Sequence, residues 1–273
     1  MSDFSGQVIF ITGASSGIGA ALVRELARRG ADVGLAARRV ERLESLAAEL
    51  RGQGRKAVAV RCDVTRDGDV EGAVAAVREA IGPISVAVAN AGFGVAGTVE
   101  RLTLEDYRRQ FETNVFGVLR TIHATLDDVK RTRGRLVIIG SVSGHVGLPN
   151  VSAYAMSKFA VRALAQSLGH ELARHGASVT LISPGFVESE IRRVDNRGVL
   201  HPDAPDTVPG RLRMPTDRAA RQIADAVARR RSEAVITLHG KVAVFFQRHT
   251  PWLVSAAVRR LALKGRREPG REG

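Results

Sequence analysis

The stretch VIFITGASSGIGAALVRELARR, residues 8–29, decides the fold that this sequence predicts. Val8–Ile11 is an apolar run of buried-strand length, and from Ile18 to Arg29 apolar residues recur at helical spacing. The glycine-rich turn Thr12–Gly19 joins them. In a doubly wound α/β fold, such a turn binds dinucleotide phosphates, because glycines allow close backbone approach and the helix N-terminus offers free N–H groups. We expect nucleotide contacts from Gly13, Ser15, Ser16, Gly17, Ile18 and Gly19.

Strand and helix patterns alternate along the rest of the chain. Strands are expected at 32–37, 57–61, 86–89, 136–139, 179–182 and 234–238, and helices at about 40–52, 70–81, 104–130, 153–174 and 217–231. This alternation predicts a Rossmann-like α/β fold, a doubly wound parallel sheet covered on both faces. We expect a single domain over residues 1–240, with a proline-rich substrate loop at 190–215, followed by a C-terminal helical extension at 241–273. A last helix should run from about 250 to 263, and residues 265–273 should fray.

Composition narrows the classes of protein. The 273-residue chain has one cysteine, so an internal disulfide is impossible and a cytoplasmic location is expected. No apolar run approaches the length of a transmembrane helix. The seven histidines lack metal-ligand spacing, so we expect no metal. Aromatic and basic residues do not alternate, and we expect no nucleic-acid partner.

Positive charge is concentrated in the C-terminal third. The net charge is +13, of which residues 191–273 carry +10, from 18 basic and eight acidic side chains. Such a segment could meet phosphates, an acidic partner or an anionic membrane surface. An arginine-rich composition that serves solubility explains the same charge, and both interpretations stay open.

The end of the second strand bears on the choice of cofactor. In sites that bind NAD(H), an acidic residue about 20 residues after the glycine turn holds the adenosine ribose. Here Arg38 follows the strand and no acid stands there. A guanidinium can bind a 2′-phosphate through two hydrogen bonds, which favours NADP(H), and the Ser15 hydroxyl could add to that contact. The alternative is that Arg38 is one solvated arginine among many.

Tyr154 and Lys158 stand four residues apart in a predicted helix, so they share one face. A nearby ammonium lowers the pKa of a phenol, which would make Tyr154 a general acid/base at neutral pH. The hydroxyl of Ser141 could hold a substrate oxygen where negative charge develops.

Taken together, these motifs resemble those of the short-chain dehydrogenase/reductase family over about residues 6–240. The resemblance rests on the TGxxxGxG turn, on Asn90-Ala91-Gly92, on Asn114, on Ser141 with the YxxxK pair, and on Pro184-Gly185. It implies that Asn114, Ser141, Tyr154 and Lys158 form the catalytic set, that Lys158 also binds the nicotinamide ribose, and that Asn114 holds a proton-relaying water. The cofactor contacts it implies are Asp63, Val64, Asn90, Ala91, Gly92, Tyr154, Lys158, Pro184, Gly185, Val187 and Ser189. Asp63 could instead only cap its loop, and Ser189 stands where the family usually has threonine.

The activity expected from chemistry and resemblance together is oxidoreduction with NADP(H), interconverting a ketone or aldehyde and the corresponding alcohol. The resemblance also implies a homodimer or homotetramer. Two other functions remain open: a non-catalytic nucleotide-sensing protein of the same fold, and a reductase of lipophilic substrates attached peripherally to a membrane. The latter depends on the extension, which could be an interfacial membrane helix, a flap or subunit contact, or a plain helix on the core.

Overall fold

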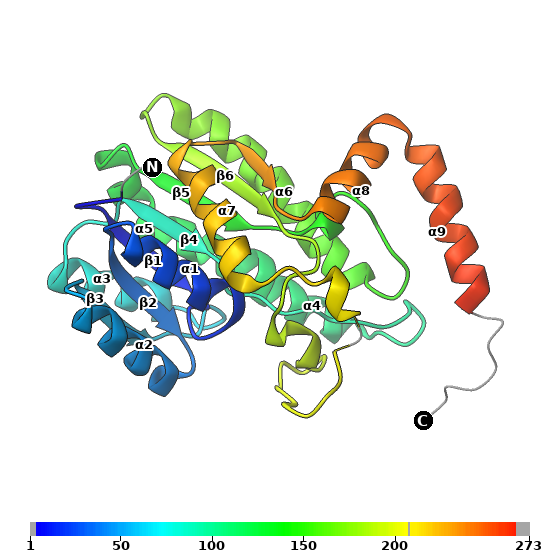
Figure 1. The fold of residues 1–273 in the computed structure, drawn as a ribbon, viewed down its shortest axis with the longest axis horizontal. Coiled ribbons are helices and arrows are strands. Elements are labelled where there is room, and N and C mark those ends of the chain that lie inside the picture. The colour runs from blue at the N-terminus through cyan, green and yellow to red at the C-terminus, as the bar shows by residue number, and fades with distance from the viewer. Residues whose placement is uncertain (1–3, 207, 266–273) are drawn as a thin grey trace.

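The computed structural model describes residues 4–206 and 208–265. Within them the chain forms a seven-stranded parallel sheet with the order β3-β2-β1-β4-β5-β6-β7 (Figure 1). The strands are β1 (Val8–Thr12), β2 (Asp32–Ala37), β3 (Ala57–Arg61), β4 (Val86–Ala89), β5 (Arg135–Ile139), β6 (Ser178–Ser183) and β7 (Glu233–Val235). The predicted doubly wound α/β fold is therefore confirmed. The order reverses between β1 and β4, and such a switch point opens a ligand crevice at the carboxyl ends of the strands.

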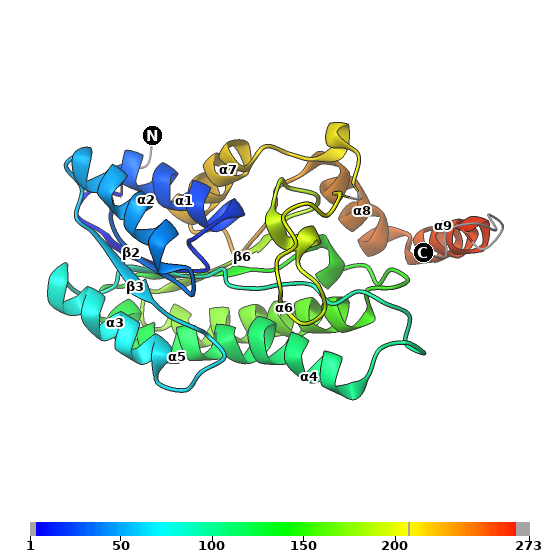
Figure 2. The same ribbon diagram turned by 90° about the horizontal axis from the view of Figure 1, so that it is seen from below.

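Helices cover both faces of the sheet, as Figure 2 shows. One layer contains α1 (Gly17–Arg28), α2 (Val40–Gly52) and α7 (Thr216–Ala228). The other contains α3 (Asp69–Ala80), α4 (Leu104–Phe111), α5 (Gly117–Arg131) and α6 (Ser152–Ala173). Two apolar clusters of buried residues, one on each side of the sheet, bind the layers to it. Because both faces are covered, the central strands are buried throughout, which explains their continuous apolar sequences.

The long helix expected at 104–130 is interrupted. Between α4 and α5, residues Glu112–Phe116 wind as a π-helix. Such wide turns are rare and are often found at functional sites. Side-chain hydrogen bonds from Asn114 to the neighbouring loop hold this turn, and helical periodicity alone does not reveal them.

The C-terminal part differs from the expectation in one respect. The last strand ends at Val235 and does not continue to 238, because Thr237 caps a new helix, α8 (Leu238–His249), by accepting a hydrogen bond from the Gly240 N–H. The expected last helix is α9 (Pro251–Gly265). In Figure 1, α8 and α9 form a hairpin that extends beyond the sheet. Of the residues expected to fray, 265–273, all but Gly265 lie outside the residues that the structure describes.

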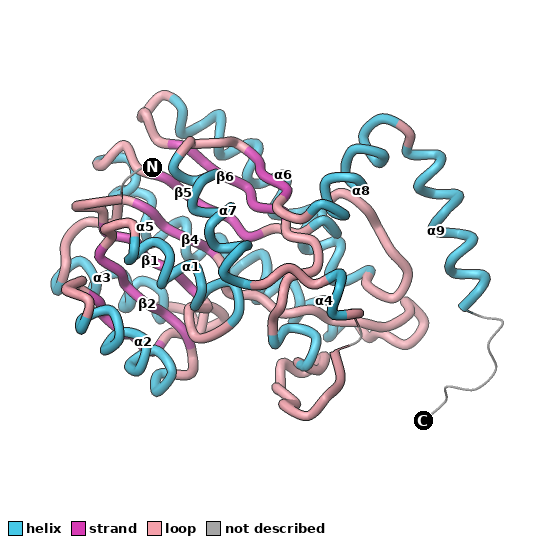
Figure 3. Tube along the Cα trace, in the orientation of Figure 1, coloured by secondary structure: helices cyan, strands magenta, loops and turns pink. Residues whose placement is uncertain are grey.

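The proline-rich segment 190–215 is mostly loop, as Figure 3 shows. It contains two short 3-10 turns, Glu190–Arg193 and Gly210–Leu212. Asp206 holds the loop together by accepting hydrogen bonds from Arg192 and Arg213. Asn196 joins it to the loop after β4 through both the N–H and the carbonyl of Ala96. In the described residues, no helix combines the length and apolar character needed to cross a membrane.

Candidate active site

The candidate site residues follow the carboxyl ends of the parallel strands, which all meet at one edge of the sheet. At the end of β1, Gly13 has a φ of +67°, which favours glycine. A Cβ on Gly13 would stand 2.8 Å from Ala91 Cα, and one on Gly19 would stand 2.3 Å from the Gly13 carbonyl oxygen. The turn therefore requires glycine at both positions. Ser16 is the N-cap residue of α1, but its side chain makes no capping hydrogen bond.

The end of β4 is fastened to this turn. The Asn90 side-chain amide donates hydrogen bonds to the carbonyl oxygens of Thr12, at 2.9 Å, and Gly13, at 3.1 Å. The Thr12 hydroxyl accepts from the backbone N–H groups of Asn90 and Ala91. Asn90 and Ala91 therefore lie beside the glycine turn, as expected, and Asn90 acts there as a brace for the two strand ends.

An arginine that sequence reasoning did not select lies over the turn. Arg39 donates hydrogen bonds to the hydroxyls of Ser15, at 3.2 Å, and Ser16, at 2.8 Å, and to the Glu190 carboxylate at 2.9 Å. Arg38 is exposed and makes no hydrogen bond within the described residues. The position expected to bind the 2′-phosphate, after β2, thus has two adjacent arginines. Of these, Arg39 contacts the serines of the turn.

Asp63 caps its own loop. Its Oδ1 accepts hydrogen bonds from the backbone N–H of Thr65, at 3.0 Å, and from the Thr65 hydroxyl, at 2.7 Å. Burial acts to raise the pKa of this carboxyl, but the Thr65 hydrogen bonds and the nearby Arg38 charge prevail and lower it. Val64 is buried beside Gly117, where a Cβ would stand 2.7 Å from Val64 Cγ2. Asp63 Oδ1 therefore caps the loop, as the alternative interpretation expected. The contact between Asp63 and the adenine stays a prediction.

Asn114 is completely buried within the π-helix. Its Oδ1 accepts from the Phe93 N–H, and its amide donates to the Phe93 carbonyl and to the Ser157 hydroxyl, each at 3.1 Å. A Cβ on Gly92 would stand 3.1 Å from Asn114 Oδ1 and 3.8 Å from Lys158 Nζ. Gly92 therefore keeps a space open between Asn114 and Lys158.

Three of the four expected catalytic side chains converge. The Ser141 hydroxyl lies close enough to the Tyr154 phenol to act to lower the pKa of that phenol. Lys158 Nζ lies 5.6 Å from the centre of the Tyr154 ring and donates to the Ile139 carbonyl at 2.8 Å. Burial lowers the pKa of Lys158 to about 8. Burial also raises the pKa of Tyr154, against the opposing effects of Ser141 and the Arg192 charge. The expected lowering of the Tyr154 pKa by Lys158 is therefore wrong for this arrangement, because the ammonium binds a carbonyl instead of the phenol.

The segment after β6 closes the site. The Pro184 carbonyl accepts from the Val142 N–H at 2.9 Å, which ties this segment to the loop that contains Ser141. A Cβ on Gly185 would collide with Thr237 Oγ1, at 2.3 Å. Val187 is buried and its carbonyl accepts from Arg192. Ser189 Oγ would be 3.4 Å from a Cβ on Gly17, so Ser189 lies beside the phosphate-binding turn.

His145 is buried beside the catalytic loop. Its Nε2 lies 3.1 Å from the Ser183 hydroxyl and 3.0 Å from Glu233 Oε1. Glu233 also pairs with Arg248 of α8 at 2.6 Å. This chain of contacts joins the base of the C-terminal hairpin to the catalytic loop. Its partners are 88 residues apart, so no local pattern could reveal it.

The arrangement fits a dinucleotide. The helix start lacks a side-chain cap, the turn excludes every Cβ at Gly13 and Gly19, and cationic side chains stand beside it. No cluster of His, Cys, Asp and Glu suited to a metal occurs among the described residues.

Comparisons with known proteins agree with this chemistry. A family model described as short chain dehydrogenase matches residues 7–199. An uncharacterized oxidoreductase of Myxococcus xanthus is 35% identical over 251 residues, covering 84% of this chain and 99% of that protein. The alcohol dehydrogenase of Thermococcus sibiricus, solved with 5-hydroxy-NADP, has a TM-score of 0.73 and 32% identity, covering 85% of this chain and 96% of that one. A Burkholderia phymatum short chain dehydrogenase/reductase, solved with NAD, has a TM-score of 0.77 and 25% identity. The match covers 100% of this chain and 99% of that one.

Proposed function

Because the chain belongs to the short-chain dehydrogenase/reductase family, whose members are oxidoreductases that use a nicotinamide cofactor, we propose that it interconverts a ketone or aldehyde and the corresponding alcohol with NADP(H). The observation that carries this proposal is the group formed by Ser141, Tyr154 and Lys158 at the strand edge that also bears the phosphate-binding turn.

Each catalytic side chain has a defined task in this proposal. The bound cofactor supplies the hydride that adds to the carbonyl carbon in the reductive direction. The Ser141 hydroxyl binds the carbonyl oxygen, where negative charge develops. Tyr154 donates its proton to that oxygen, so that the alcohol leaves neutral. Burial raises the pKa of Tyr154 and keeps the phenol protonated at neutral pH, which suits a proton donor.

Lys158 and Asn114 would restore the proton. With a pKa of about 8, Lys158 can give up and regain a proton near neutral pH. Its Nζ faces the space that Gly92 leaves open beside Asn114. We propose that a water held there passes a proton through Lys158 to Tyr154, and that Lys158 also binds the nicotinamide ribose.

The preference for NADP(H) rests on two arginines. A 2′-phosphate carries negative charge that a carboxylate would repel and a guanidinium binds. Arg39 already contacts the hydroxyls of Ser15 and Ser16, and Arg38 lies next to it in the chain. Related structures contain either NADP-type or NAD cofactors, so the choice has to come from these side chains.

The test measures oxidation of NADPH and of NADH with a panel of aldehydes and ketones, using Tyr154→Phe as the control. We expect turnover with NADPH that the substitution abolishes. Turnover that survives in Tyr154→Phe would refute the role of Tyr154. Tight NADPH binding without turnover on any compound would favour a nucleotide-sensing protein of the same fold.

Assembly and location are also proposed. We propose a homodimer or homotetramer, which light scattering of the purified protein measures directly. A cytoplasmic location suits the single cysteine, Cys62, which is free and buried. We propose that the small-molecule carbonyl or alcohol substrate enters beside the loop at 190–215, which lies next to the candidate active site through Val187 and Ser189.

A further inference from the structure

The helical hairpin formed by α8 and α9 is attached to the body of the molecule by α8. Figures 1 and 2 show α9 standing clear of both helical layers, with α8 between it and the sheet. The buried side of α8 contains Val244, which is 3% exposed, and Gly240, where a Cβ would stand 2.8 Å from Val142 Cγ2. The base of the hairpin is therefore packed, whereas no other part of the chain that the structure describes covers its outer part.

The opposite side of α8 is apolar and faces outward. Leu238, Val242, Phe245 and Phe246 recur at the i, i+4, i+7 and i+8 spacing of one helix face. They are exposed, Leu238 at 77% and Phe245 at 58%. We call these four residues the apolar stripe. An amphipathic helix normally turns such a stripe toward the protein core, so this orientation calls for a partner outside the chain.

The start of α9 adds further exposed apolar side chains to the hairpin. Trp252 is 68% exposed and Leu253 follows it, also exposed. Aromatic residues of this kind prefer the headgroup level of a membrane, where the ring meets both apolar and polar surroundings.

Basic side chains flank the stripe along the hairpin. Residues 238–265 contain no acidic side chain. Lys241 stands one turn before Phe245 on the helix surface, and Arg248, one turn after it, is paired with Glu233 of β7. Interfacial helices combine an apolar face with flanking basic residues in this way, and the long basic side chains reach the lipid phosphates.

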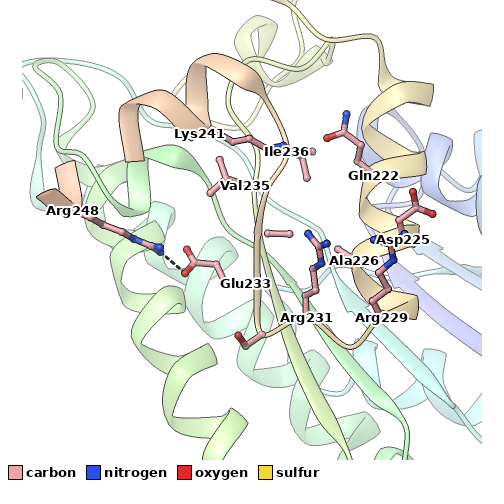
Figure 4. A pocket seen from close by; sticks show the side chains of 12 residues that line it. Gln222, Asp225, Ala226, Arg229, Arg231, Glu233, Val235, Ile236, Lys241 and Arg248 are labelled. Atoms are coloured by element: carbon pink, nitrogen blue, oxygen red, sulfur yellow. Dashed lines mark hydrogen bonds and ion pairs between the residues drawn. The ribbon is translucent and has the colours of Figure 1, made fainter. Parts of the chain in front are cut away.

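A basic pocket lies at the base of the hairpin, and Lys241 and Arg248 of α8 contribute to its lining. It has a volume of about 640 Å³, and Arg229, Arg231 and Lys241 line it, as Figure 4 shows. Among the described residues these three cations have no acidic partner, while the acids of the pocket are already paired, Asp225 with Arg29 and Glu233 with Arg248. The pocket therefore offers unpaired positive charge at the base of the helix that bears the stripe.

We propose that the α8–α9 hairpin binds the surface of a membrane containing anionic phospholipids, with the apolar stripe and Trp252 in the interfacial region and the basic pocket against the headgroup phosphates. A second copy of the chain fits less well. In a two-fold symmetric contact the same patch meets itself, and here the unpaired cations Arg229, Arg231 and Lys241 of each copy would oppose those of the other, while the acids of the pocket are already paired. This proposal does not depend on the proposed function, because it concerns side chains outside the candidate active site.

The test uses the full chain with vesicles of phosphatidylglycerol and phosphatidylcholine, compared with vesicles of phosphatidylcholine alone. Trp252 is the only tryptophan in the sequence, so its emission reports on the hairpin itself. We expect sedimentation with the anionic vesicles, a blue shift of the emission, and weaker binding as salt concentration rises.

Two sets of variants separate the apolar and the electrostatic contributions. The double variant Phe245→Ser/Phe246→Ser should weaken vesicle binding by at least about tenfold, because both rings lose their burial in lipid. Phe116→Ser, a phenylalanine of similar exposure on the other helical layer, is the matched control and should bind unchanged. Arg229→Gln/Arg231→Gln should weaken binding to anionic vesicles by about fivefold or more, whereas Arg51→Gln on α2 should not.

Three results would overturn the proposal. The first is a failure to sediment with the anionic vesicles, with no change in tryptophan emission. The second is equal binding to neutral and anionic vesicles. The third is a vesicle-independent dimer that the double phenylalanine variant dissociates, which would assign the stripe to a second copy.

Discussion

The Glu190 carboxylate is hydrogen-bonded to the Arg39 guanidinium, which we expect to bind the 2′-phosphate of NADPH. Its carboxylate accepts hydrogen bonds from Arg39 and Arg42, each at 2.9 Å. A phosphate that binds Arg39 must displace or share this carboxylate. The Arg39 and Glu190 side chains are 35% and 31% exposed, so solvent screens the pair and its net contribution is at most about 1 kcal/mol. Glu190→Gln should therefore lower the Kd for NADPH, by up to about fivefold.

Removal of Arg39 should have the opposite and larger effect. A hydrogen bond to a charged group contributes about 1.5–3 kcal/mol, so Arg39→Ala should raise the Kd for NADPH by about 10- to 150-fold. The Kd for NADH should change little, because that cofactor lacks the phosphate. Fluorescence titration of the parent protein and of Arg39→Ala, each with NADPH and with NADH, measures the four dissociation constants. Arg42→Ala is the control, since Arg42 pairs with Glu190 but makes no contact with the serines of the turn.

The result that refutes this reasoning is specific. If Arg39→Ala leaves the ratio of the two constants unchanged while Arg38→Ala abolishes the preference, then Arg38 alone reads the phosphate. If neither substitution changes the ratio, the chain does not select its cofactor through these arginines.

Three further predictions concern single positions. Gly19→Ala should abolish cofactor binding and lower the melting temperature, because the new Cβ would meet a carbonyl oxygen at 2.3 Å, whereas Gly52→Ala, with open space around it, should leave both unchanged or slightly raise stability. Burial, with nearby acids, raises the pKa of the Cys62 thiol to about 12, so the folded protein should resist alkylation by iodoacetamide at pH 7 and react only when unfolded; rapid labelling of the native chain would contradict this. The hydrogen bond from His145, assisted by Arg248, lowers the pKa of Glu233 to about 2, and this contribution to stability is present above about pH 4.5 and lost as pH falls toward 2. Glu233→Gln should thus reduce the free energy of unfolding at pH 7 by about 1–3 kcal/mol, with a difference from the parent protein that narrows below pH 4.5 in denaturant titrations.

The sequence predicted those parts of the molecule that depend on local patterns. Alternating apolar runs and helical spacing located the strands, because a buried parallel strand must be apolar and a covering helix must be amphipathic. The site at the strand ends followed from topology once Gly13, Asn90 and Ser141 were each placed after a strand.

Other features depend on contacts that no local pattern contains. Arg38 and Arg39 are adjacent residues, and only the path of their side chains places Arg39 on the serines. The apolar spacing of α8 indicates a helix but not whether its stripe faces inward or outward. The pairing of His145 with Glu233 joins segments that meet only after the sheet has formed.

The packing of α1 against α7 sets the order in which the protein can mature during synthesis. Leu22 and Leu26 of α1 belong to the same buried cluster as Ile223 of α7, and Arg29 binds Asp225 at 2.7 Å. At ribosomal rates of about 5–20 residues per second, α7 emerges roughly 10–40 s after α1. During that interval the apolar face of α1 is uncovered. A nascent chain that stops before α7 therefore presents a face that chaperones and proteases recognise, and only a chain that extends through α7 can bury it.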